Sequence, residues 1–192
     1  MAKKDPVTSK RERNKMIRWV ITIFFVTILI SGIISLVSDE VMANSSLTVA
    51  FVILLAIIFL GIVFDIIGMA VATADEKPFH SMAARKVPGA QEAIRLLRNA
   101  ERVSSICNDV VGDICGVVSG SASATIAALI LLNADVDWPR GVSLAMSALV
   151  AGLTVGGKAV GKNIAVRSCT SIVYMVGRMV HGVNRITGKK KK

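Results

Sequence analysis

The chain has 192 residues, of which 53% are hydrophobic, and carries a formal net charge of +10 at pH 7. This composition leaves little material for a soluble domain and is typical of an integral membrane protein. The charge alone would suit a nucleic-acid ligand. However, the bases lie in blocks between apolar runs with no recognisable nucleic-acid-binding module, so we expect no nucleic-acid partner. We predict an all-α membrane protein.

Four apolar runs are long enough to cross a bilayer, which requires about 20 residues of α-helix. The predicted spans are approximately 17–37, 47–73, 110–133 and 141–160. We expect helices because backbone polar groups in lipid must be satisfied within the segment itself. A cleaved signal peptide is the alternative for the first run, since Val41-Met42-Ala43 resembles a cleavage site. The run is longer than the roughly 7–15 residues of a signal, which favours an uncleaved span.

The positive charges predict the orientation of these spans. Of the 23 Lys and Arg residues, 22 lie in the stretches Lys3–Arg18, Lys77–Arg102 and Lys158–Lys192, and the two short connectors hold only Arg140. Lys and Arg are retained on the cytoplasmic side of a membrane. We therefore expect a plasma-membrane protein with both termini and the central loop in the cytoplasm.

Basic segments flank a single transmembrane domain, predicted over 19–186. Residues 1–18 are expected to form a disordered basic tail and residues 187–192 a second one, both near anionic lipid headgroups. Two segments, about 89–107 and 164–186, repeat apolar residues at three- and four-residue steps and carry bases between them. We predict cytoplasmic juxtamembrane amphipathic helices there; a helix that simply packs under the bundle is the alternative for the first.

Enzymatic and metal-cluster chemistry find little support. The two histidines, His80 and His181, appear isolated, and Cys107, Cys115 and Cys169 lack the spacing of a zinc or disulfide motif. No pattern suggests a nucleophile with its base. We expect neither an enzyme nor a resident cofactor.

Small residues recur at four-residue steps on the last two spans. They are Gly112, Gly116 and Gly120 on the third, and Gly152 and Gly156 on the fourth, which also carries Gly157 and Gly161. Such faces allow helices to approach closely in lipid. They predict packing between these two spans or in a homodimer, and a polar cavity would also need them.

Ionisable residues interrupt the spans. Asp65 lies in the second, Asp113 opens the third and Lys158 closes the fourth, all in the cytoplasmic half of the predicted topology. Charges within a span are costly and usually face the protein interior. One interpretation is an internal ion pair between Lys158 and Asp65 or Asp113. The other is a polar site for a cation or proton.

Three segments carry a resemblance to a known family. The first, Phe64–Val71, resembles F-x-x-x-E-x-A-L. The second, Gly89–Leu97 with Glu101-Arg102, resembles G-A-x-x-A-L-x-L-L…E-R. The third, Gly157–Ala165, resembles G-E-x-x-P-K-[ST]-x-A. These motifs, in this order, belong to the transmembrane domain of the CorC and cyclin M magnesium transporters. The resemblance covers roughly residues 47–185.

The resemblance implies a small dimeric membrane domain that handles magnesium as a transported ion. A site built from Asp65, Asp113 and hydroxyls such as Ser119 would suit magnesium, which prefers oxygen ligands. Gly112-Asp113 is the best match to the family's G-N pair, and Asn108 is the second candidate.

The chain also departs from the family pattern. Gly68 and Lys158 stand where its motifs have glutamates, and Gly161 replaces a proline. The first span is additional, and the cystathionine-synthase-like domains of typical members have no counterpart. A lysine at position 158 would repel a divalent cation. The alternative function is therefore a non-transporting membrane scaffold or assembly factor, in which Lys158 replaces the bound cation.

Overall fold

The computed structural model describes residues 6–43, 45–133 and 138–187, and these form helices throughout. Helix α1 (Pro6–Ala43), α2 (Leu47–Thr73) and α7 (Pro139–Arg167) are continuous. The remaining long helix is assembled from α5 (Ala100–Ser105), the π-helix η1 (Ile106–Gly112) and α6 (Asp113–Asn133). The short helices α3 (Lys77–Ala84) and α4 (Ala90–Arg98) precede it, and α8 (Cys169–Ile186) follows α7.

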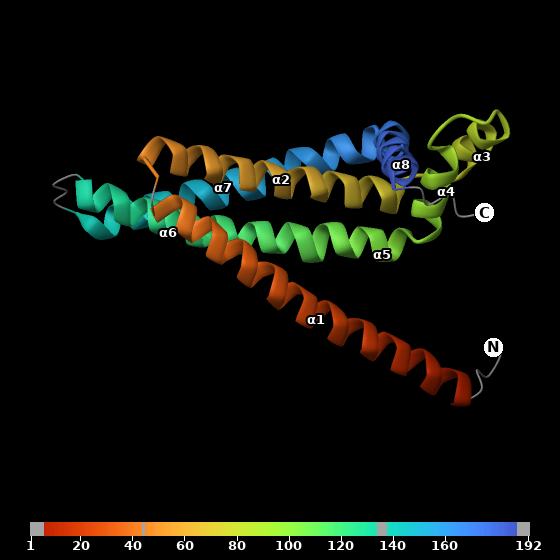
Figure 1. Cartoon of the computed structure of the whole chain (residues 1–192), viewed down its shortest axis with the longest axis horizontal. Helices are drawn as coiled ribbons and strands as arrows, with labels where there is room; N and C mark the ends of the chain where they lie inside the picture. Colours follow the sequence, from red (N-terminus) through yellow and green to blue (C-terminus); the bar gives the residue numbers. More distant parts are fainter. Residues whose placement is uncertain (1–5, 44, 134–137, 188–192) are drawn as a thin grey trace.

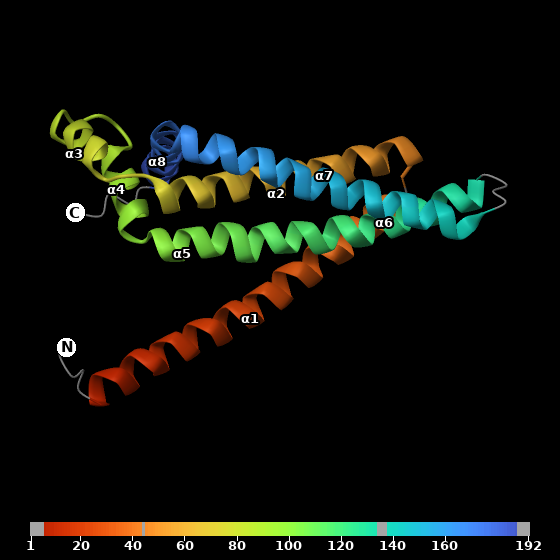
Figure 2. The same cartoon turned by 180° about the vertical axis from the view of Figure 1, so that it is seen from behind.

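Four helices are long and apolar enough to cross a membrane, which confirms the predicted fold class. Their candidate spans are Met16–Ser38, Leu47–Thr73, Ala100–Asn133 and Pro139–Arg167. Helices α2, α6 and α7 pack against one another along their length (Figure 1). Helix α1 packs mainly on α6 and diverges from the bundle toward the N-terminus, as both side views show (Figure 2).

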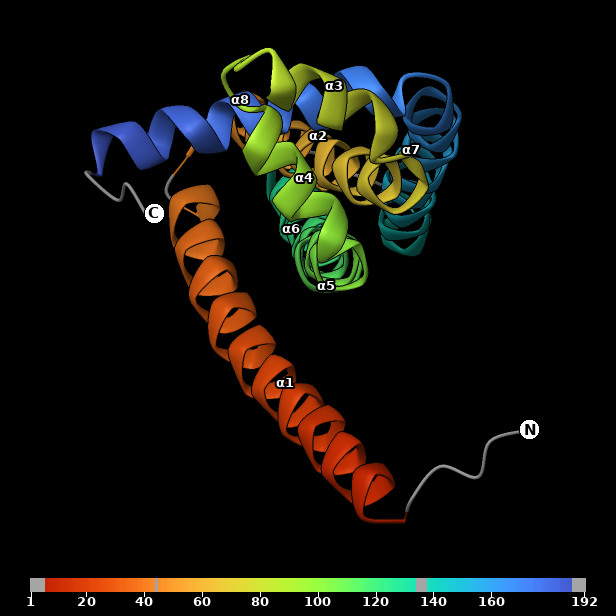
Figure 3. The same cartoon turned by 90° about the vertical axis from the view of Figure 1, so that its right-hand side faces the viewer.

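Helices α3, α4 and α8 gather at the end of the bundle where α2 and α7 finish. Viewed along the bundle, α8 runs across its end with α4 beside it (Figure 3). A glycine bend makes this possible: Gly89, at the start of α4, has a φ of 88°, which side-chain-bearing residues rarely adopt. The backbones then meet so closely that a Cβ on Gly177 of α8 would lie 2.6 Å from the Gly89 carbonyl oxygen.

Three apolar clusters hold the bundle together. The first joins α2, α6 and α7 near the α6–α7 connection, around Leu54, Ile126 and Val150. The second lies at the α3–α4–α8 end, around Val71, Phe79 and Val173. The third is smaller and packs η1 and α6, around Val118, against α1 and α2. Along α2, the buried carboxylate of Asp65 lies between the first cluster and the second.

Both predicted amphipathic helices begin or end elsewhere than expected. The helix expected over 89–107 stops at Arg98, and Ala100–Ser105 instead continues into the third span. The helix is interrupted at Asn99, which has a φ of −115°. The side-chain amide of Asn99 donates a hydrogen bond to the Arg95 carbonyl at 2.9 Å. The periodicity of apolar residues carries across this break, which is why the sequence pattern did not reveal it.

The fourth span is longer than predicted: α7 continues to Arg167. The helix expected over 164–186 accordingly begins only at Cys169. Lysine is a good helix former, so Lys158 and Lys162 do not end α7. The disorder expected up to residue 18 is also wrong from Pro6 onward, where α1 is already helical. Proline suits the first helical turn, and the Lys, Arg and Glu residues after it favour helix. Residues 1–5 and 188–192 of the basic tails lie outside the described residues.

Candidate functional site

An ion pair with a buried carboxylate joins α2 and α7. Asp65 on α2 is 6% exposed, and its Oδ1 lies 3.8 Å from the Nζ of Lys158 on α7. A buried carboxylate is costly unless it is paired. Of the two acids that the sequence offered to Lys158, the structure selects Asp65.

The π-helix η1 forms the wall of this site opposite α7. Its last residue, Gly112, leaves room for the pair: a Cβ there would lie 3.3 Å from Lys158 Nζ and 4.0 Å from Asp65 Oδ1. A π-helix pairs each carbonyl with an amide five residues on, and such turns are frequent at functional sites. Gly112 therefore contributes to the site by its lack of a side chain.

Two side-chain oxygens near the pair are buried and have no hydrogen-bond partner. They are Oδ2 of Asp65 and Oδ1 of Asn108 in η1. The Asn108 amide nitrogen donates to Ser104 Oγ at 3.3 Å, which directs the carbonyl oxygen toward α2. There it occupies the space that a side chain at Gly68 would fill, since a Cβ on Gly68 would overlap Asn108 Oδ1.

These contacts place the two free oxygens on adjacent turns. On α2, Asp65 precedes Gly68 by three residues; on η1, Asn108 precedes Gly112 by four. Asp65 faces Gly112 and Gly68 faces Asn108, as expected of antiparallel helices whose neighbours recur every three or four residues. We call Asp65, Asn108, Gly112 and Lys158 the polar layer.

Two predicted ligands lie outside the polar layer. Asp113, the residue after the π-helix, is exposed, and the described residues offer it no ion pair. Ser119 is buried, at 1% exposure, but lies about two helical turns farther along α6, and its hydroxyl donates to the Gly116 carbonyl at 2.9 Å. The structure thus supports Asp65 and Asn108, but neither Asp113 nor Ser119, as members of one site.

Gly112, one of the glycines expected to pack spans together, is in close contact with another helix through Lys158, but four others are not. A Cβ on Gly116, Gly120, Gly152 or Gly156 would meet no other atom within 4 Å, so these residues do not bring the helices of one chain into close contact. They line open grooves instead: Gly116 and Gly120 lie between α6 and α7, and Gly152 and Gly156 between α7 and α2.

The close helix contacts are made by Gly61, which the sequence analysis did not single out, and by Gly157 and Gly161, which were expected to pack. On α2, a Cβ on Gly61 would lie 2.9 Å from the Cβ of Cys115 on α6. On α7, a Cβ on Gly161 would lie 2.8 Å from Ile66 Cγ1. These residues bring α6 and α7 against the segment of α2 that holds Asp65.

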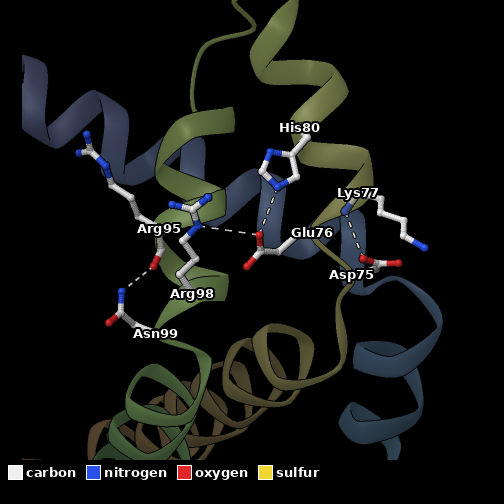
Figure 4. Close-up of polar contacts among 7 residues, drawn as sticks. All are labelled: Asp75, Glu76, Lys77, His80, Arg95, Arg98 and Asn99. Atoms are coloured by element: carbon white, nitrogen blue, oxygen red, sulfur yellow. Dashed lines mark hydrogen bonds and ion pairs between the residues drawn. The ribbon is translucent and has the colours of Figure 1, made fainter.

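Polar contacts join the short helices near the end of the bundle (Figure 4). Glu76 links two of them, with Oε2 at 3.2 Å from His80 Nε2 on α3 and 3.9 Å from Arg98 Nε on α4. Asp75 Oδ1 accepts a hydrogen bond from the Lys77 backbone amide at 3.1 Å. His80, which appeared isolated in the sequence, therefore has a carboxylate partner.

His181 also has a partner. Its Nδ1 donates to Glu92 Oε1 at 3.0 Å and so connects α8 to α4. Partial burial pushes the pKa of Glu92 upward, but the hydrogen bond and positive charge of His181 outweigh it, and the pKa is lowered overall. The contribution of this carboxylate to stability is thus present above its ordinary pKa and is lost as the pH falls through the lowered value.

Within the described ranges, no group of three His, Cys, Asp or Glu side chains is placed to hold a metal ion. Any cation in the polar layer would therefore depend on a mixed set of oxygens, from carboxylate, amide, backbone and water. No family model, no curated protein and no solved structure matches the chain.

Proposed function

We propose that the chain is a cation-handling membrane protein of the CorC type, in which the polar layer binds a divalent cation. Asp65 and Asn108 supply the protein oxygens, and magnesium as the transported ion suits them because it prefers oxygen ligands and keeps several of its waters. The observation that carries the proposal is the pair of buried, partnerless oxygens. Each such group costs about 1–3 kcal/mol when left unsatisfied, and a cation with its waters relieves that cost.

Lys158 regulates this site in the proposal. Its ammonium occupies Asp65 when no cation is bound, so a divalent ion must displace it. The Lys158 side chain is 23% exposed, and its long stem lets the charge move toward the membrane surface while the methylenes stay in the bundle. Asp65 would then be paired alternately with the Lys158 ammonium and with a bound divalent cation.

The scaffold function remains the second candidate, and the ion pair itself favours it. With Lys158 at 3.8 Å, Asp65 already has a positive partner, and the chain needs no metal to balance that charge. In this case the joined helices α3, α4 and α8 would present a surface for a partner at the end of the bundle.

A thermal-stability assay separates the two functions. If the polar layer binds magnesium, the ion at about 100 times its Kd should stabilise the purified chain by roughly 2.7 kcal/mol, or about 5–10 °C in Tm. Asp65→Asn should abolish that shift. Asp113→Asn is the matched control, because it removes an equal charge outside the polar layer, and it should leave the shift intact. Sodium chloride of equal ionic strength controls for screening.

The scaffold function makes the opposite forecast. The wild-type Tm should not respond to magnesium, whereas Lys158→Glu should be unstable and rescued by the ion, because it leaves two acids in the polar layer. That pair of results would contradict transport by this chain.

The orientation is part of the proposal: both termini cytoplasmic, in the plasma membrane. After Cys169→Ser removes the half-buried native thiol, Ser45→Cys should react with a membrane-impermeant maleimide added to intact cells, and Ser81→Cys should react only after permeabilisation. Labelling of both positions from outside would contradict this topology.

We also propose a homodimer. Among the residues that the structure describes, no helix covers the open glycine faces on either side of α7, and small residues in lipid favour close approach of a second helix.

A further inference from the structure

Helix α8 lies crosswise at the end of the bundle, at the level where α7 finishes. Only Ser168 separates it from α7, the fourth candidate span, which ends at Arg167. Lys162 and Arg167 are both exposed near that end, and long basic side chains near the end of a span reach to the headgroups. Figure 3 shows that α8 runs across the bundle axis and that its C-terminal half extends beyond α2 and α4. A helix in this position starts at the level of the membrane surface and runs along it.

One side of α8 is covered by the protein itself. Val173 and Gly177 are buried, and a Cβ on Gly177 would lie 3.0 Å from the Cβ of Ala93 on α4. One turn farther on, His181 is hydrogen-bonded to Glu92 of the same helix. Both side views place α4 beyond α8, on the side away from the spans (Figures 1 and 2). The opposite side of α8 therefore faces back toward the level of the spans.

That opposite side carries a row of exposed apolar residues. Met175 and Met179 come two residues before and after Gly177, which at about 100° per residue places both about 160° around the helix from it. Val183 and Ile186 continue the row, and these four side chains are between 58% and 88% exposed. We call Met175, Met179, Val183 and Ile186 the apolar stripe. A helix with such a stripe that lies parallel to the membrane plane typically buries it at the boundary between headgroups and acyl chains.

The charges of α8 indicate which surface covers the stripe. Arg178 and Arg185 are exposed on the side next to it, and within the described ranges neither forms an ion pair. The helix contains no Asp or Glu, and the sequence continues into Lys189–Lys192. Long arginine stems let the charge reach headgroups while the apolar side stays in the lipid, and anionic headgroups attract each base near the surface. Stripe and charges together match an anionic membrane surface.

We propose that α8 docks on the leaflet at this end of the bundle and recognises anionic phospholipid. The apolar stripe lies among the acyl chains, and Arg178 and Arg185 bind the phosphate groups. Because α8 also holds α4 through Gly177 and His181, the membrane surface fixes the position of α4 as well. This docking does not depend on the proposed cation function.

Fluorescence quenching locates the stripe in the full chain, held in phosphatidylcholine–phosphatidylglycerol nanodiscs whose two surfaces are both open to solvent. After Cys169→Ser, a bimane label is attached at Met179→Cys or, as a second position, at Val183→Cys; the other native thiols are buried. Brominated acyl chains should quench both labels, and aqueous iodide should leave them unquenched. Arg185→Cys is the matched control on the polar side of the same helix, and iodide should quench its label.

The label at Met179→Cys also measures the lipid preference. Bromine is placed either on the phosphatidylglycerol or on the phosphatidylcholine, at equal mole fractions. Phosphatidylglycerol should quench more, because each arginine near the surface enriches an anionic lipid by up to about fivefold at low ionic strength. Arg178→Gln/Arg185→Gln should make the two lipids equal. Arg140→Gln, at the opposite end of α7, should leave the preference unchanged.

Three results would overturn the proposal. Quenching of Met179→Cys and Val183→Cys by iodide but not by bromine would place the stripe in water. Protection of both labels from both quenchers would show that protein covers the stripe and would assign it to a second copy of the chain. Equal quenching by the two brominated lipids, with both arginines present, would show that α8 does not recognise anionic lipid.

Discussion

Lys158→Met should lower the stability of the chain by about 3 kcal/mol or more, because it leaves the buried Asp65 carboxylate without its positive partner. In thermal melts followed by circular dichroism in a mild detergent, this corresponds to a fall in Tm of roughly 6–12 °C. The double variant Asp65→Asn/Lys158→Met should recover most of the loss, since it removes both charges and keeps the shape of the acid. Such non-additivity is the signature of two residues in direct contact.

Lys162→Met is the matched control for this prediction. It removes the same charge one turn farther along α7, at an exposed position, and should change Tm by little. If Lys158→Met and Lys162→Met change Tm by the same small amount, then the Lys158 ammonium lies outside the polar layer and the ion pair does not stabilise the fold.

Gly116→Leu and Gly156→Leu should convert the proposed homodimer into a monomer while leaving the fold of each chain intact. A Cβ at either position would have no neighbouring atom of the described residues within 4 Å. A leucine side chain therefore has space in the monomer, but it would obstruct a neighbouring helix. Light scattering on the detergent-solubilised protein should show the protein mass halved, with an unchanged far-ultraviolet spectrum.

Two further glycines make the comparison specific. Gly32→Leu also enters open space, on α1, and should leave the mass unchanged. Gly61→Leu should instead destabilise the chain itself, because its Cβ would already lie 2.9 Å from Cys115 Cβ. A dimer that persists in both Gly116→Leu and Gly156→Leu would place the interface elsewhere or remove it.

The membrane-spanning helices of this chain were predictable from the sequence, whereas the exact positions of the breaks between helices were not. The lengths of the apolar runs predicted four helices long enough to cross a membrane, because the thickness of the hydrocarbon region sets how many consecutive apolar residues a span needs. The break at Asn99 escaped prediction, and the boundary expected between residues 160 and 164 lies at Ser168 instead, since neither residue is a strong helix breaker and the apolar spacing continues past both.

The polar layer was predicted in part, for a physical reason. The cost of a buried charge made a partner for Lys158 necessary, and Asp65 is that partner. Asp113 was expected beside it because the predicted topology puts both in the same half of the membrane, but the π-helix before Asp113 widens one turn and changes which face the following residues occupy. The contact of Asn108 with Gly68 depends on the same turn, and no sequence pattern signals a π-helix here.

The joined helix α5–η1–α6 has a mechanical consequence. Its 34 residues extend about 50 Å as one unbroken rod, with Gly112 about a third of the way along. The far part of the rod packs on α2 and α7 through one apolar cluster, and its near end packs on α2 and follows α4 directly through Asn99. We expect a displacement of α4 to be transmitted through this continuous helix to the wall formed by Gly112 and Asn108, because no loop separates them beyond Asn99.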